Sequence, residues 1–230
     1  MPKLKPETQA ARREHILDAA ERCFARAGFH RTTMQDICKE AGVSAGALYV
    51  YFSSKEELIA GISERDRAKL GAELSEIGNA PDLMSALRQL GEHYCIEQPR
   101  QKNILCIEIG AESTRNPVVG QIYQTFDQGM LDAFESVLST ARDEGKIAPS
   151  IAPRDAANIL QLIGDGLFWR RAIDPNFKAA QFIPFLMDIV AGFLNPQPAD
   201  QPATVKPVAT KRPPKSGQAR ARSRSNEIAP

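Results

Sequence analysis

Apolar residues recur at α-helical spacing along most of this chain, and proline interrupts the pattern only where one helical segment gives way to the next. In the first segment, Ile16, Ala20 and Phe24 fall on one face, and Gly28 follows as a stop signal. A proline inside a helix lacks an amide donor and clashes with the preceding turn, so the later prolines are expected at helix entrances or in linkers. These are Pro81, Pro99, Pro117, Pro153 and Pro175. With no alternating β pattern of useful length, the sequence predicts an all-α fold.

About nine helices are expected. Capping boxes mark two of their starts, because Thr33 precedes Asp36 in an acidic variant and Ser54 precedes Glu57. Gly42 ends the second helix. The expected segments are 8–27, 33–41, 44–51, a long helix from 54, 82–97, 100–113, 117–144, 153–172 and 177–194.

The formal net charge of +1 conceals an uneven distribution of charge. Residues 196–230 contain seven Lys or Arg and two acidic residues, whereas residues 1–195 contain 22 basic and 26 acidic residues. The basic segment has almost no apolar side chains, so it cannot bury enough surface to offset the entropy of ordering. The sequence therefore predicts an N-terminal domain at 1–53, a helical domain at 54–195 and a disordered tail at 196–230.

The composition argues against several functional classes. Four scattered cysteines and three histidines form no familiar metal-ligand spacing, and such cysteines are typical of buried or idle thiols in a reducing cytoplasm. No apolar run approaches the ~20 residues of a membrane span, and the N-terminus lacks the apolar core of a signal peptide. We therefore expect a soluble, cytoplasmic protein without a metal or other cofactor. An enzyme is disfavoured, because nothing orients His93 with Cys95 or Cys106 as a catalytic group.

The string AGVSAGALYVYF, residues 41–52, joins two short helices through a glycine, as a helix-turn-helix does. Gly42 permits the sharp turn, and Val43 and Leu48 are expected to point inward against Ile37 and Ile16. The outer face carries small side chains only, so its backbone can enter a DNA major groove and its amides can favour phosphate. These small residues are Ser44, Ala45, Gly46 and Ala47. The alternative is a plain helical bundle, where short helices with a glycine turn also occur.

Two tyrosines and a lysine flank that bare helix tip. The hydroxyls of Tyr49 and Tyr51 are within reach of phosphate if the tip enters the groove, and their rings would cover sugar and base surface. Lys55 follows the Ser54 cap and adds a cation to a helix N-terminus that already attracts phosphate. Phe52 is expected in the core of the small domain.

The sequence RTTMQDICKEAGVSAGALYVYFSSKEELI, residues 31–59, resembles the DNA-binding domain of TetR-family transcriptional regulators. The resemblance implies a second, helical domain for ligand binding and dimerisation, and a homodimer on double-stranded operator DNA. It also implies that Thr33 and Lys55 contact phosphate, that the 44–47 face lies in the groove, and that Tyr49 and Tyr51 contact the DNA backbone and base edges.

Two positions depart from the family pattern. The family often has Lys or Arg where Ala45 stands and His where Tyr51 stands, so a long donor for guanine is missing. We expect greater reliance on van der Waals contact and DNA shape. Further cations are available at Arg31 or in the N-terminal arm, at Lys3, Lys5, Arg12 and Arg13.

The last two helices carry apolar stripes that are wider than one internal face requires. The first stripe contains Ile159, Leu160, Ile163, Leu167 and Phe168, and the second contains Phe182, Phe185, Leu186, Ile189 and Phe193. Such stripes favour pairing with a second copy as a four-helix bundle, and the resemblance implies the same. The alternative is that both stripes only complete an internal core.

The resemblance implies a small-molecule pocket among the fourth to eighth helices, where large apolar residues are mixed with isolated polar ones, as in ligand cavities. The candidates are Tyr94, Ile104, Leu105, Glu108, Ile109, Glu112, Tyr123, Phe126, Met130, Phe134, Asp165 and Trp169. A single Met or Phe in this set is more often a core residue. Glu108 and Glu112 share one helix face, which is either solvated or orients a phenolic or cationic ligand. Trp169 is expected where the pocket meets the dimer interface.

These observations predict a repressor that a small hydrophobic or aromatic effector releases from its operator, with an efflux operon as one target. Regulation of lipid or other metabolism is an alternative. A further alternative is a DNA-binding regulator without an effector, controlled by a protein partner.

Overall fold

The structure, a computed structural model, describes residues 6–198 and contains nine α-helices within that range. They are α1 (Pro6–Ala27), α2 (Met34–Ala41), α3 (Ala45–Tyr49), α4 (Lys55–Gly78), α5 (Leu83–Glu92), α6 (Arg100–Ser113), α7 (Pro117–Asp143), α8 (Pro153–Ile173) and α9 (Ile183–Leu194). The all-α fold predicted from the periodicity is confirmed.

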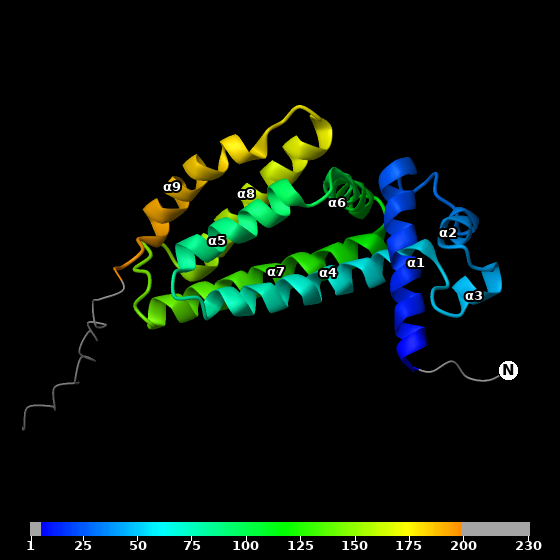
Figure 1. Cartoon of the computed structure of the whole chain (residues 1–230), viewed down its shortest axis with the longest axis horizontal. Coiled ribbons are helices and arrows are strands. Elements are labelled where there is room, and N and C mark those ends of the chain that lie inside the picture. The colour runs from blue at the N-terminus through cyan, green and yellow to red at the C-terminus, as the bar shows by residue number, and fades with distance from the viewer. Residues whose placement is uncertain (1–5, 199–230) are drawn as a thin grey trace, which may run out of the picture.

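Two long helices, α4 and α7, run side by side through the molecule (Figure 1). Helices α1–α3 lie at one end of this pair, with α1 standing across it, and α5, α8 and α9 lie along its other part. The short helix α6 lies between α1 and the ends of α7 and α8 and packs on all three. It therefore occupies the boundary between the two halves of the protein.

The helix-turn-helix forms as its sequence signals predict. Thr33 and Asp36 form a reciprocal capping box at the start of α2, and Gly42 ends that helix in the left-handed conformation with φ 61°. Leu48 of α3 is fully buried together with Ile16 and Ile37. The inward side of α3 therefore pins this short helix to α1 and α2.

The apolar core of this N-terminal part continues across residue 53. Ile59 and Ile62 of α4 belong to it, and so do Leu105 of α6 and Val119 of α7. A five-residue helix cannot bury enough surface by itself, so packing against these longer helices stabilises the domain. A second core, between α4, α5, α7, α8 and α9, fills the remainder of the bundle.

Two helices differ from the predicted ranges by more than two residues at one end. The segment predicted as one helix at 82–97 ends its α-helical part at Glu92 and continues as a π-helical turn, His93–Glu97. The last helix begins at Ile183 instead of residue 177, after a 3₁₀ turn at Ala179–Gln181. Pro184 explains the later start, because it is accepted in the first turn of a helix but not in its interior.

The first residues of the predicted basic tail are held by backbone hydrogen bonds. The amide of Gln197 donates to the carbonyl of Lys146 at 2.8 Å, and the amide of Ala148 donates to the carbonyl of Asn195 at 3.0 Å. Residues 196–198 therefore lie against the α7–α8 loop. The remainder of the tail, 199–230, and the arm residues Lys3 and Lys5 lie outside the described residues.

Candidate nucleic-acid interface and effector region

The outer side of α3 is bare, as the small residues predicted. Ser44 caps the helix by accepting a hydrogen bond from the Ala47 amide at 3.2 Å. Ala45 and Gly46 are exposed, Ala47 is half-buried, and no atom lies within 4 Å of the position where a Gly46 Cβ would stand. The backbone of this turn is therefore free to approach a large partner closely.

The two tyrosines differ in exposure. Tyr49, at the end of α3, is 53% exposed, and Val50 beside it is 79% exposed. Tyr51 is half-buried and packs against the core of the N-terminal domain. Tyr49 is therefore the aromatic side chain that is more available to a partner of α3.

The polar atoms of the two predicted phosphate contacts are engaged within the protein. The Thr33 hydroxyl donates to the Asp36 carboxylate at 2.6 Å. The Lys55 ammonium donates to the carbonyl of Phe29 and lies 4.2 Å from the centre of the Phe29 ring. Burial lowers the pKa of Lys55, in opposition to nearby Glu56 and Glu112. In this arrangement Lys55 ties α4 to the loop between α1 and α2.

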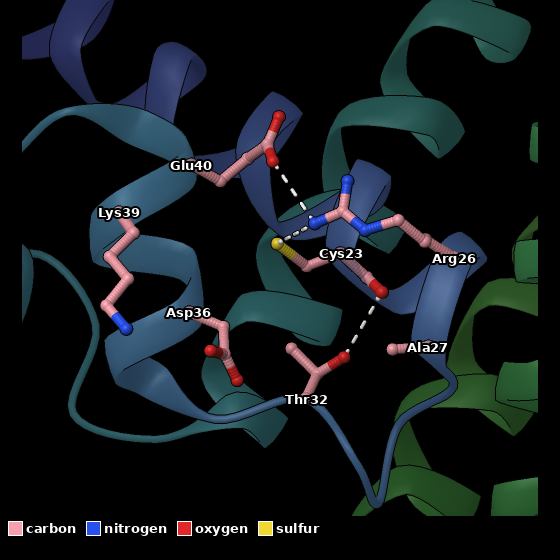
Figure 2. A pocket seen from close by; sticks show the side chains of 7 residues that line it. All are labelled: Cys23, Arg26, Ala27, Thr32, Asp36, Lys39 and Glu40. Carbon is pink, nitrogen blue, oxygen red and sulfur yellow. Dashed lines mark hydrogen bonds and ion pairs between the residues drawn. The ribbon is translucent and has the colours of Figure 1, made fainter.

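A surface hollow of about 470 Å³ lies between α1 and α2 (Figure 2). Its polar groups include Arg26, whose guanidinium donates to Glu40 at 3.2 Å and to the Cys23 sulfur at 3.6 Å. The hydroxyl of Thr32 donates to the Cys23 carbonyl at 3.2 Å. The rim carries two cations and two carboxylates, Arg26, Lys39, Asp36 and Glu40. Because the positive and negative charges balance, the hollow does not favour binding of a polyanion such as DNA. It is also separate from the outer surface of α3.

The predicted pair Glu108 and Glu112 faces the N-terminal domain. Glu108 accepts a hydrogen bond from the Phe29 amide at 3.3 Å. The Glu112 carboxylate lies 2.7 Å from His30 Nε2 and 3.0 Å from Arg115 Nε, and its side chain is only 3% exposed. The Glu112 carboxylate is buried and Glu108 is half-buried, and both contact the loop between α1 and α2.

Most other predicted effector residues are parts of the packed interior. Leu105 and Ile109 pack into the core of the N-terminal domain. Met130 is buried in the second core, with Phe126 and Phe134 packed against it. Tyr94 donates from its hydroxyl to Glu73 at 2.7 Å, and burial, followed by this bond, raises its pKa. Ile104 is half-buried. Their apolar character is explained by packing, which the sequence also allowed.

A polar region remains where α6, α7 and α8 meet. Burial, followed by Asp165 and Asp127, raises the pKa of Tyr123. Asp165 keeps accessible surface, yet partial loss of hydration and the charge of Asp127 raise its pKa. Cys106 is also accessible, although desolvation raises the pKa of its thiol to about 11.

Sequence reasoning missed part of this region. Gln161 of α8 donates to Asp127 of α7, which fixes the carboxylate beside Tyr123. Cys106 was treated as idle, because its neighbours on other helices are far away in the chain. Only the helix packing brings these groups together.

An exposed apolar face covers α8 and α9. Trp169 is 54% exposed and lies on this face, with Phe185 at 68%. The face also contains Leu162, Ile173, Phe182 and Ile189. The other residues predicted for an interface, Ile159, Ile163, Leu167, Leu186 and Phe193, are half-buried, and Ile163, Leu167 and Phe193 pack against the cores of the bundle. Leu162 and Ile173, which the sequence did not single out, are the exposed apolar residues of α8 beside Trp169.

Residues 6–198 contain neither a candidate metal site nor a candidate membrane-spanning helix. No group of three or more His, Cys, Asp or Glu side chains in that range is arranged to hold a metal ion. No helix in the same range is both long and apolar enough to span a membrane.

Comparison with known proteins agrees with this architecture. Residues 16–62 match the family model described as bacterial regulatory proteins of the tetR family, and residues 85–195 match the C-terminal domain of BetI-type transcriptional repressors. The HTH-type transcriptional repressor Rv1474c of Mycobacterium tuberculosis is 35% identical over 184 residues, which cover 78% of this chain and 94% of that protein. The chain belongs to the TetR family.

Other relatives place this TetR-family protein among transcriptional regulators. The HTH-type transcriptional regulator UidR of Escherichia coli is 28% identical over 198 residues, covering 84% of this chain and 98% of UidR. A solved structure of SmeT, the repressor of the Stenotrophomonas maltophilia multidrug efflux pump SmeDEF, is 26% identical with a TM-score of 0.65 and covers 83% of this chain and 96% of SmeT. The structure of a SmeT–triclosan complex is similar with a TM-score of 0.69 at 28% identity. The match covers 87% of this chain and 100% of that SmeT chain. This TetR-family member is a DNA-binding transcriptional regulator with the family's all-α fold.

Proposed function

We propose that this TetR-family regulator is a repressor that binds its operator as a homodimer and leaves it when a small effector binds. The observation that carries the proposal is the bare outward turn of α3 beside the exposed ring of Tyr49. A turn without bulky side chains allows close approach of its backbone to base edges, and the tyrosine supplies contact to backbone and bases. Ser44, Ala45, Gly46 and Ala47 would enter the groove, with Tyr51 at its edge.

The proposed dimer forms through the exposed apolar face of α8 and α9. A patch that contains Trp169, Phe182 and Phe185 at the surface of a soluble protein is typical of an interaction site. A twin subunit would bury this face and present a second α3. The two recognition helices would then read half-sites about one helical turn of DNA apart, roughly 34 Å.

The proposed effector site is the region between α6, α7 and α8. Tyr123 and Asp165, which the sequence predicted, lie there with Cys106 and Asp127. Trp169 is exposed one turn beyond Asp165 on α8. The similarity to SmeT, which has a complex with triclosan and represses an efflux pump, supports an aromatic effector and an efflux operon. A hydroxyl or amine on that compound would suit the polar groups of the site.

Operator binding is tested with the DNA upstream of the protein's own gene. Fluorescence anisotropy would compare this duplex with a shuffled duplex of the same composition at moderate salt. Specific regulators prefer their site by about 10³-fold or more, so we expect a preference of that order. Equal affinity for both duplexes, or a monomer in solution, would refute the proposal.

The effector is tested separately. A panel of aromatic and hydrophobic compounds is screened for a rise in melting temperature, and each hit is added to the protein–operator complex. A true effector should weaken operator binding by about 5–150-fold. A panel without any stabilising compound would favour control by a protein partner.

A further inference from the structure

Helix α6 has two functionally different faces. Leu105, Glu108, Ile109 and Glu112 recur at i, i+3, i+4 and i+7, and all four contact the N-terminal domain or its core. On another side of the same helix, Gly110 faces α7, and Cys106 lies near Tyr123 of α7 and Asp165 of α8. A Cβ on Gly110 would stand 3.9 Å from the Tyr123 ring. One rigid helix thus touches both the DNA-binding domain and the proposed effector site.

The contact between Glu112 and His30 joins two parts of the chain that are 82 positions apart. Glu112 is a carboxylate with a side chain only 3% exposed, and it is paired with His30 Nε2 at 2.7 Å and with the Arg115 guanidinium at 3.0 Å. A buried charge is costly without such partners. His30 itself is 65% exposed, so it can be replaced without opening the core.

Glu108, which lies one helical turn before Glu112 on α6, contacts the same loop segment, residues 28–30. It accepts the Phe29 amide at 3.3 Å, and its Oε2 atom lies 3.0 Å from where a Gly28 Cβ would stand. Gly28 has φ +80°, a conformation that glycine adopts readily. The absence of a side chain also leaves room for the Glu108 carboxylate. Lys55 binds the Phe29 carbonyl from the α4 side. The turn 28–30 is therefore held between α4 and α6.

A second set of contacts ties the other part of α1 to the bundle. Arg65 of α4 lies 2.8 Å from Asp18 and 3.1 Å from Glu14. Lys102, in the first turn of α6, binds Glu21 of α1 as well as Asp66 of α4. These bonds start from α4 and from the opposite end of α6. They fix α1, but they do not touch the turn that leads into α2.

We propose that Glu108 and Glu112 are positioning residues that set the orientation of the DNA-binding domain, so that a displacement of α6 reaches the operator through the turn 28–30. This inference rests on the proposed function. It adds that α6, through these two carboxylates, transmits the effector signal. Because coupling between two sites is reciprocal, operator binding must also alter the surroundings of α6.

Cys106 offers a measurement of that change without a known effector. It is the accessible cysteine of the four, whereas Cys23, Cys38 and Cys95 are buried. The rate at which N-ethylmaleimide modifies Cys106 is measured on the full chain, free and saturated with operator duplex, and Cys106→Ser identifies the signal. We expect operator to change the wild-type rate by about fivefold or more.

The variants separate coupling from folding. His30→Ala and Glu112→Gln should bring the ratio of the two rates close to one while operator is still bound, as anisotropy verifies. His30→Lys, which supplies Glu112 with a donor and a cation at the same position, should restore the ratio. Glu97→Gln is the matched control, because Glu97 pairs with His93 at 3.1 Å within one helical segment of the C-terminal domain. It should leave the ratio unchanged.

Two results would overturn the inference. One is a wild-type rate that bound operator does not change. The other is an unchanged ratio in both His30→Ala and Glu112→Gln. Failure of the wild-type protein to bind operator would instead overturn the proposed function, and the anisotropy control distinguishes these cases.

Discussion

His30 and Glu112 meet at 2.7 Å across the boundary between the DNA-binding domain and the helical bundle. His30 belongs to the loop between α1 and α2, and Glu112 to the last turn of α6. Glu108 reaches the same loop at Phe29. The orientation of the helix-turn-helix is therefore set by polar contacts as well as by the shared apolar core.

Gly28→Ala should destabilise the protein more than Gly42→Ala does. Both glycines have positive φ, which costs a residue with a side chain about 1–2 kcal/mol. Only at Gly28 would the new methyl group also meet a neighbour, the Glu108 carboxylate at 3.0 Å. Urea unfolding measures the two free energies. Equal losses in the free energy of unfolding for the two variants would show that the Glu108 side chain moves aside without a measurable energetic penalty.

Gly46→Ala should stabilise the fold and weaken operator binding. Alanine is preferred to glycine in a helix by up to about 1 kcal/mol, and the Gly46 position is open. The added methyl group, however, occupies the surface proposed to enter the groove. Gly71→Ala in α4 is the control, because it also meets no atom within 4 Å and lies away from α3. Anisotropy and urea unfolding are measured on both variants, and a Gly46→Ala protein with unchanged operator affinity would argue against this groove contact.

Phe185→Asp should convert the proposed dimer to a monomer. Phe185 is 68% exposed in one chain, so the substitution costs little within the subunit but places a charge in the twin interface. Sedimentation velocity gives the mass, and circular dichroism should show unchanged helix content. Val118→Asp changes another exposed apolar residue, at the start of α7, and should leave the mass unaltered. A dimeric Phe185→Asp protein would exclude this face.

Glu40→Gln should lower the melting temperature by a few degrees at neutral pH and by nothing in acid. Hydrogen bonds from Arg22 and then Arg26 lower the pKa of Glu40. A lowered pKa means that the stabilisation is present above the unfolded value, near 4.3, and is lost as the pH falls through the folded value. Thermal melts from pH 7 to pH 3 should therefore converge for the two proteins. A constant difference at every pH would mean that packing, not charge, accounts for the effect.

Local signals in the sequence were sufficient for the helices themselves. Thr33, Gly42 and Ser54 stand at the caps where they were expected, because capping and left-handed turns depend on a few neighbouring residues. The bare tip of α3 and the burial of Leu48 and Phe52 followed from the same short-range pattern. The two largest differences are the later entry to α9 and the π turn after α5, and they lie beside Pro184 and Pro99.

The sequence by itself therefore determined the helices, their order and the bare outer surface of α3. Tertiary structure alone decided which side of each later helix is covered. The helical period of a sequence shows that two faces of a helix differ, but it does not show which neighbour each face contacts. The partners of Glu108 and Glu112 therefore became evident only from the fold, which places the turn 28–30 beside α6. For the same reason, only packing revealed that Leu162 and Ile173 are exposed on α8 while Ile163 is half-buried against the second core.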